Sequence, residues 1–177
     1  MSSATGGATK NFHRGHTASR PYKYPPDKRI MISVIQRVRS ASVTVNSRAV
    51  GTINTGIMAL VAVEQKDTEK QADRLLERIL NYRIFNDDQG RMNLNLRAIN
   101  GGLLLVPQFT LAADTNSGNR PSFTSAASPE KGRELFEYLR TAADIIYPDT
   151  QYGEFGADMQ VALVNDGPAT FILQVSV

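Results

Sequence analysis

The chain of 177 residues contains no cysteine, and both of its histidines, His13 and His16, lie within the first 30 residues. The absence of cysteine excludes disulfides, thiolate catalysis, thiol-ligated zinc and iron–sulfur clusters. Without histidine after residue 30, the rest of the chain can form neither a Ser-His-Asp nor a Cys-His site, and it has no HExxH motif. Walker and GxGxxG loops are also missing. Any catalysis must therefore use carboxylates, lysine, a hydroxyl, backbone dipoles or the substrate itself.

Long hydrophobic runs are absent too, since no apolar stretch approaches the roughly 18 residues that span a bilayer. The hydrophobic fraction of 41% and the charged fraction of 21% are ordinary for a globular protein. We therefore predict one domain with a substantial core and no membrane segment. A reducing cytosol is the default compartment for such a chain.

The basic charge of the chain is confined to a leader, residues 1–30, which carries six cations against Asp27 for a net charge of +5. Residues 31–177 carry 14 cations against 16 anions, net −2, so any RNA contact there must be local and weakly salt-dependent. The leader is rich in Gly, Ser, Thr and Pro and is predicted to be disordered. It could be a transit peptide, but a native tail, a mis-assigned start or a vector-derived extension is favoured, with Met31 as the original start.

Strand patterns dominate the first part of the predicted domain. Residues Met31–Val38, Ala41–Val45 and Ala49–Ile53 indicate a meander with a turn at Asn46–Ser47, and the uniformly apolar run Ile57–Val63 after Gly56 indicates a strand buried on both faces. Later, a turn at residues 87–90, the alternation of residues 92–96 and a turn at residues 100–102 leading into residues 103–106 indicate another hairpin. Two further β-rich segments, residues 159–164 and 169–175, flank a turn at residues 165–168.

Two helices are predicted among these strands. Thr68 and Gln71 resemble a capping box before an apolar stripe at Ala72, Leu75, Leu76, Ile79 and Leu80. Ser128 and Pro129 begin a second stripe that runs to Ile146 and ends before Pro148. Because the order is not a regular βαβ alternation, we predict an α+β fold.

Paired or lone carboxylates offer little chemistry by themselves. Asp87 and Asp88 occupy a turn sequence, and Asp114 and Asp158 are single acids in loops, where capping and turn hydrogen bonds are their usual roles. No metal site is predicted.

The polar segments at residues 105–111 and 165–170 are better candidates. The first could be a plain strand end or a set of backbone N–H groups that face an oxyanion, and the second could be a tight turn or a rigid Gly-Pro projection.

A series of segments, in order from Met31 to about Val175, resembles the D-aminoacyl-tRNA deacylase (D-tyrosyl-tRNA deacylase) family, and the leader lies outside the resemblance. The segments are Ile35-Gln36-Arg37-Val38, Ala41-Ser42-Val43-Thr44-Val45, Tyr82-Arg83-Ile84-Phe85, Met92-Asn93-Leu94-Asn95, Gln108-Phe109-Thr110-Leu111, Arg120-Pro121-Ser122-Phe123, Ala157-Asp158-Met159 and Asn165-Asp166-Gly167-Pro168-Ala169-Thr170. One short motif could recur by chance, whereas an ordered series of this length could not reasonably do so.

This resemblance implies mixed and antiparallel β-sheets in a barrel-like core covered by two helices, assembled as a cytoplasmic homodimer. It implies a cofactor-free carboxylic ester hydrolase that proofreads translation by cleaving D-aminoacyl-tRNA, and glycyl-tRNA mischarged on tRNA(Ala), at the terminal aminoacyl-adenosine. Gly167-Pro168 would be cis and would enter the partner's pocket, where its carbonyls occupy the space of an L side chain. Rejection of this kind checks chirality and not side-chain identity.

The resemblance also assigns roles to individual residues. Arg37 would orient the Gly-Pro segment, although a strand cation is its plain interpretation. Gln108, Phe109 and Thr110 would form the catalytic segment, whose backbone N–H groups polarise the ester. Thr110 has no histidine base, so the resemblance favours water attack assisted by the 2′-hydroxyl of the terminal adenosine. Met159 would pack near the adenine or simply in the core.

Pro107, at the edge of the substrate-binding segment, departs from the family, which usually has serine there. Proline removes a hydroxyl and a backbone N–H, so a hydrogen bond from serine to substrate would be lost. A related animal deacylase also has Pro-Gln here but replaces the following phenylalanine, which Phe109 retains, so we keep the D-selective interpretation.

Two alternatives stay open. In a relaxed deacylase, Pro107 and Ala169 would loosen chiral rejection, and D and L substrates would separate the cases. In a non-catalytic nucleic-acid-binding protein, the leader would supply affinity, and its deletion would reduce the salt dependence of binding.

Overall fold

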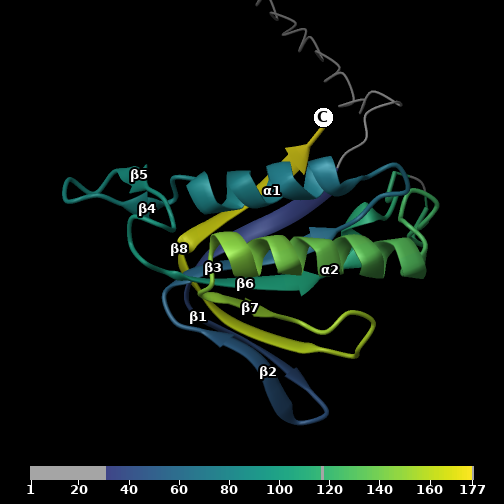
Figure 1. The fold of residues 1–177 in the computed structure, drawn as a ribbon, viewed down its shortest axis with the longest axis horizontal. Coiled ribbons are helices and arrows are strands. Elements are labelled where there is room, and N and C mark those ends of the chain that lie inside the picture. The colour runs from purple at the N-terminus through teal and green to yellow at the C-terminus, as the bar shows by residue number, and fades with distance from the viewer. Residues whose placement is uncertain (1–30, 117, 177) are drawn as a thin grey trace, which may run out of the picture.

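The computed structural model describes residues 31–116 and 118–176, and it has two helices lying side by side over one face of a curved sheet (Figure 1). The strands are β1 (Met31–Val45), β2 (Arg48–Ile53), β3 (Gly56–Ala62), β4 (Phe85–Asn86), β5 (Met92–Leu94), β6 (Gly102–Pro107), β7 (Thr150–Tyr152) and β8 (Gln160–Val175); the helices are α1 (Glu69–Asn81), η1 (Phe109–Ala112) and α2 (Pro129–Ile146). The α+β prediction is confirmed. The predicted leader lies outside the described residues, and within these none of the helices has the length and apolarity to cross a membrane.

β1 is one continuous strand, where the sequence predicted two. Residues 32–38 pair with β3 and residues 41–45 pair with β2 along one edge of β1. Along the other edge β8 pairs with it from Met31 to Thr44, including Ser40 with Val164. Arg39 and Ser40 are polar and interrupt the alternation of apolar residues, but they remain part of the strand because β8 pairs with β1 alongside them. The predicted turn after β1 is confirmed, with positive φ at Asn46 and Ser47.

β3 and β6 lie in the middle of the sheet and are buried on both faces, as the apolar run after Gly56 predicted. They pair in parallel, with Ile57 opposite Leu103 and Met58 opposite Leu104. Ile57 and Leu103 belong to the core beneath the helices, whereas Met58 and Leu104 belong to a second core on the other face of the sheet. Full burial on both faces makes these strands rigid supports for whatever follows their ends.

The sheet order is β2-β1-β3-β6-β7, with β8 on the far edge of β1. The sheet curls until β2 approaches β7, so that it is nearly closed and barrel-like. Gly51 of β2 permits this approach, because a Cβ there would stand 2.7 Å from the carbonyl oxygen of Tyr152 in β7. The second core fills the space inside the curl.

Both predicted helices are confirmed. At the start of α1 the N–H of Thr68 donates to Oε1 of Gln71 at 3.0 Å, and Ser128 caps α2 by accepting from the N–H of Lys131 at 3.3 Å. The predicted stripe of α1 is buried in the first core. In α2, Leu135, Phe136, Leu139 and Ala143 are buried there too, whereas Ile146, the last residue of the predicted stripe, is 48% exposed.

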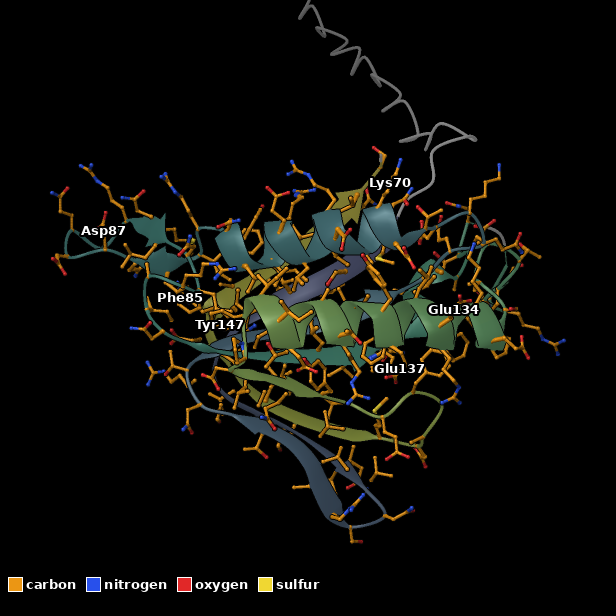
Figure 2. All side chains as sticks on the ribbon, in the orientation of Figure 1. Lys70, Phe85, Asp87, Glu134, Glu137 and Tyr147 are labelled. Atoms are coloured by element: carbon orange, nitrogen blue, oxygen red, sulfur yellow. The ribbon has the colours of Figure 1, made fainter. Side chains whose placement is uncertain are left out.

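A small hairpin of β4 and β5 follows α1, and its strands pair across the predicted turn. Asp87 lies at the tip of this hairpin, which projects beyond the end of α1 (Figure 2). β6 does not join the hairpin and pairs instead with β3 and β7.

Candidate active site

In the segment after β6, the backbone N–H groups of Phe109 and Thr110 donate neither to the sheet nor within η1. The N–H of Gln108 still belongs to the sheet and donates to the carbonyl of Val61 at 2.7 Å. The first bond of η1 runs from the N–H of Leu111 to the carbonyl of Gln108 at 3.2 Å. The N–H groups of Phe109 and Thr110 lie between these two bonds, at the N-terminus of η1, where helical amides have no internal partner. Two adjacent donors of this kind suit a carbonyl oxygen that gains negative charge.

Pro107 fits the end of β6 without disturbing the sheet. The N–H of Leu103 donates to Asp149 on the β7 side, and that of Gln108 donates to Val61 on the β3 side. Because alternate residues of a strand direct their amides to opposite neighbours, the nitrogen of Pro107 faces the β7 side. There the last ladder pair is Leu105 with Tyr152, so Pro107 lies beyond the pairing and no ladder hydrogen bond is missing.

An apolar pocket of about 240 Å³ opens beside this segment. Strand ends supply one wall, the start of α2 supplies another, and the loop after β7 supplies a third. Its lining residues are Val61, Val63, Pro107, Gln108, Phe109, Ala127, Ser128, Pro129, Gly132, Phe136, Phe155 and Gly156. The pocket therefore combines an apolar interior with the start of the polar segment, at Gln108 and Phe109.

Gln108 and Phe109 line the pocket, and Thr110 follows them in η1. Nε2 of Gln108 donates to Oγ1 of Thr110 at 2.6 Å, which holds the amide and the hydroxyl together. Phe109 is 58% exposed and packs against the ring of Phe123, which is 40% exposed, at a centroid distance of 5.2 Å. Two exposed aromatic rings in contact are unusual on a surface that meets only water.

Met159 and Pro107 both lie close to Gly153. A Cβ on Gly153 would stand 2.9 Å from Sδ of Met159 and 3.2 Å from Cδ of Pro107. The N–H of Glu154 donates to the same sulfur at 3.3 Å, which fixes the thioether at the edge of the β7 loop. The structure thus brings Met159 to the same region as the segment 107–110.

The predicted turn at residues 165–168 does not separate two strands: it lies inside β8, where residues 166–169 form a bulge. Asn165 pairs with Val38 and Thr170 pairs with Gln36, so the four residues between them oppose Arg37 alone. This register makes the segment stand out from the sheet. The local residues Asn, Asp, Gly and Pro are typical of turns, but β1 continues on both sides and holds β8 as one strand.

Gly167 and Pro168 are exposed on this bulge, and the peptide bond between them is cis. Gly167 has φ of +136°, which disfavours any side chain. A Cβ at this position would also stand 2.9 Å from Nη2 of Arg37. Glycine is therefore required here both by the backbone and by the space left for Arg37.

Arg37 supports the bulge from beneath and is only 7% exposed. Its Nε donates to the carbonyl of Asp166 at 2.9 Å, and its Nη1 donates to the carbonyl of Ile84 at 2.6 Å. Arg39 donates to the Asp166 carboxylate at 2.9 Å. This hydrogen bond, with the charges of Arg37 and Arg39, holds the pKa of Asp166 below its ordinary value.

Asn165 closes the bulge on its other side. Its Oδ1 accepts from the N–H of Ala169 at 2.8 Å, and its Nδ2 donates to Oγ1 of Thr170 at 3.1 Å. The ends of the bulge are therefore tied to each other as well as to β1.

The two candidate segments do not meet within one chain. Neither Gly167 nor Pro168 lines the pocket beside Phe109, and no hydrogen bond joins the bulge to residues 107–110 across residues 31–116 and 118–176. Of the predicted site residues, the structure groups Pro107, Gln108, Phe109, Thr110 and Met159 in one place and Arg37, Gly167 and Pro168 in another.

Sequence reasoning missed Phe155, Phe136 and the start of α2 as parts of the pocket. It also missed a carboxyl pair near the pocket, just beyond Val63. Burial raises the pKa of Glu64 to about 7, and Asp67 adds to this; burial also raises the pKa of Asp67 to about 6. Oδ2 of Asp67 accepts from the N–H of Glu64 at 2.7 Å. Within the described ranges no three His, Cys, Asp or Glu side chains gather as a metal site.

Comparison with protein families gives one match of high coverage. The family described as D-Tyr-tRNA(Tyr) deacylase matches residues 34–174. A protein of Pseudomonas putida W619 named D-aminoacyl-tRNA deacylase is 59% identical over 145 residues, which cover 82% of this chain and 100% of that protein. One of the same name from Paraburkholderia xenovorans LB400 is 58% identical over 149 residues, covering 81% of this chain and 98% of that one.

Solved structures resemble the same region. A protein titled c-Myc DNA Unwinding Element Binding Protein superposes with a TM-score of 0.77 at 34% identity, over 82% of this chain and 99% of that chain. A probable eukaryotic D-amino acid tRNA deacylase superposes with a TM-score of 0.73 at 14% identity, over 82% and 100%, which is a likeness of fold alone.

Proposed function

The chain belongs to the D-Tyr-tRNA(Tyr) deacylase family and is a hydrolase of this kind, and we propose that it cleaves the ester of D-aminoacyl-tRNA in a site built from two copies of the chain. The observation that carries the proposal is the pair of N–H groups of Phe109 and Thr110, which have no acceptor within residues 31–116 and 118–176, beside an apolar pocket that Phe109 lines. The reaction serves translation in the cytoplasm by releasing D-amino acids, and glycine mischarged on tRNA(Ala), from tRNA.

In this proposal the terminal adenosine enters the apolar pocket, and its ester carbonyl lies against residues 108–110. The base packs on Phe155, since a flat base stacks well on an aromatic ring, and Met159 lies at its edge. Water attacks the ester carbon and gives a proton to the 2′-oxygen of the same ribose, while the 2′-hydroxyl passes its own proton to the departing 3′-oxygen. The new C–O bond replaces the bond to the 3′-oxygen, so the products are the free amino acid and tRNA.

Backbone N–H groups carry the catalysis in this scheme. The N–H groups of Phe109 and Thr110 bind the oxyanion of the tetrahedral intermediate, and one such donor is commonly worth about 10²–10³ in rate. Donors fixed at the end of a strand buried on both faces need no rearrangement when charge develops. The scheme needs no side-chain base, which agrees with the absence of histidine after residue 30.

Selectivity is assigned to the bulge of a second copy. Gly167 and Pro168 stand out from β8, are exposed, and are held by Arg37 and Asn165, yet they do not reach the pocket of their own chain. We assign their carbonyls to the space that an L side chain would need in the partner's pocket. A glycyl ester has no side chain and is admitted.

The surface of β8 supports dimer formation. Among the described strands it pairs with β1 alone, so no second strand lies along the other edge of this 16-residue strand. Val164 and Ile172 on this strand are 53% and 68% exposed. A strand edge of this length that carries exposed apolar residues is commonly covered by another chain. Sedimentation of the full chain at several concentrations tests the dimer.

Hydrolysis of D-Tyr-tRNA, L-Tyr-tRNA and Gly-tRNA(Ala) by the full chain, with a chelator present, tests the activity. We expect cleavage of the D and glycyl esters and survival of the L ester. Comparable cleavage of L-Tyr-tRNA would indicate a relaxed deacylase. Failure to cleave any ester, with tRNA still bound, would refute the catalytic proposal in favour of a nucleic-acid-binding role.

A further inference from the structure

A polar groove of about 560 Å³ adjoins the apolar pocket and shares Phe155 with it. α2 forms one side of the groove, and β7 with the start of β2 forms the other. It is lined by Arg48, Val50, Arg133, Glu137, Arg140, Asp144, Thr150, Gln151, Tyr152, Gly153, Glu154 and Phe155. None of the residues that the sequence singled out as site residues lines it. A nucleic-acid strand whose last base occupies the pocket must continue past its rim, and the groove is a polar surface next to that rim on the side of Phe155.

Three arginines and three acidic residues line the groove, so it has no strong field of either sign. Two of the acids are already engaged. Glu137, which Figure 2 shows on α2, accepts from Nη1 of Arg140 at 3.2 Å. Asp144 accepts from the hydroxyl of Tyr152 at 2.5 Å. Arg140 lies over the ring of that tyrosine, with its Cζ 4.7 Å from the ring centroid. Arg140 is therefore neutralised within the groove wall.

Arg133 is different, because it is exposed and makes no ion pair with any residue in the ranges 31–116 and 118–176. Its Cζ lies 5.0 Å from the ring centroid of Phe155, so the guanidinium covers that ring. Gly132 makes room for this arrangement, since a Cβ there would stand 3.1 Å from Cζ of Phe155. A stacked guanidinium is held in place while the N–H groups on its edge remain available to an oxyanion.

We propose that Arg133 binds the phosphate on the 5′ side of the terminal adenosine of the tRNA. The inference rests on the proposed function, because the base must occupy the pocket that Phe155 lines. Arg133 then stands at the border between the pocket and the groove, where the first internucleotide phosphate leaves the pocket. It positions the substrate and does not touch the reacting atoms, so a substrate that lacks this phosphate should not need it.

The test compares two D-tyrosyl esters, one on full-length tRNA and one on the 3′-oxygen of adenosine alone, with the full chain and its Arg133→Gln variant. We expect kcat/KM on tRNA to fall about fivefold, within the range for one charge-assisted contact near a surface. The salt dependence of log(kcat/KM) should become shallower by about 0.7, the value for one phosphate contact on a single strand. Hydrolysis of the adenosine ester should be unchanged.

Arg74→Gln is the matched control, because it removes the same charge from an exposed position of α1 and lines neither cavity. Arg133→Lys keeps the charge without the planar fork and should recover part of the loss. Equal losses on both esters would mean that Arg133 acts through Phe155, and an unchanged rate on tRNA would mean that it binds no phosphate; either overturns the inference while the deacylase activity stands. Wild-type protein that cleaves neither ester would refute the proposed function itself.

Discussion

Replacement of Arg37 by methionine would separate the support of the Gly167–Pro168 bulge from the packing around it. Methionine is unbranched and fills much of the space of the arginine stem, but it donates no hydrogen bond. The buried carbonyl of Ile84 loses its donor at 2.6 Å, which costs about 1–3 kcal/mol. The carbonyl of Asp166 is only partly buried and can turn to water, so its loss costs about 0.5–1 kcal/mol.

We therefore expect Arg37→Met to lower the free energy of unfolding by about 2–3 kcal/mol, measured by urea denaturation followed by circular dichroism. On the proposed function, the loosened bulge should also lower the preference for D-Tyr-tRNA over L-Tyr-tRNA by about tenfold, which corresponds to about 1.4 kcal/mol. The preference is the ratio of the two kcat/KM values.

Arg39→Met provides the control, since Arg39 binds the carboxylate of the same residue, Asp166, but its side chain is 75% exposed. That change should cost about 0.2–1 kcal/mol and leave the preference nearly intact. If the two variants lose the same stability and keep the same preference, the idea that Arg37 carries the bulge is wrong.

Three other outcomes are expected. Gly51→Ala should lower the free energy of unfolding by about 1–3 kcal/mol in urea titrations, because the added Cβ would stand 2.7 Å from the Tyr152 carbonyl oxygen. The free energy of unfolding should fall as pH rises from about 4 to about 8. Burial raises the pKa of Asp67 to about 6 and that of Glu64 to about 7, so in this range the folded chain holds protons that the unfolded chain has released. Asp67→Asn should make the dependence of stability on pH shallower. Thr110→Val should keep single-turnover hydrolysis of D-Tyr-tRNA within about tenfold of wild type, and a thousandfold loss would make the hydroxyl a reactant.

Elements that are decided by their own side chains were predictable. The stripe of α1 and the cap at Thr68 are visible in the sequence because a helix satisfies its backbone locally. The run after Gly56 was equally clear, since a strand buried on both faces needs apolar residues throughout. The parallel pairing of β3 with β6 was not predicted, because residues from α1 to β5 separate the two strands and their pattern does not name a partner.

The errors lie where a distant strand decides the local structure. Residues 165–168 have a turn composition, yet Asn165 and Thr170 both pair with β1, so that residues 166–169 form a bulge within one strand. Likewise, residues 39–40 break the alternation of β1 but stay extended against β8. The pocket was missed because its walls come from three separate parts of the chain. Gly132 was the available signal, since glycine inside a helix costs about 1 kcal/mol relative to alanine and often marks a close neighbour, which here is Phe155.

The proposed site divides its two tasks between different parts of the fold, and this division explains how Pro107 is accommodated. Ester cleavage is assigned to main-chain N–H groups after β6, which are fixed by the sheet through Gln108 and Val61. Chirality is assigned to the bulge of β8, which is fixed by Arg37 and Asn165. Pro107 belongs to neither support: its nitrogen faces β7 beyond the last pair of β6 with β7, and its ring packs beside Gly153. On the proposed function, proline in place of serine at this position would remove a side-chain contact to substrate while leaving both the oxyanion donors and the excluding carbonyls in place.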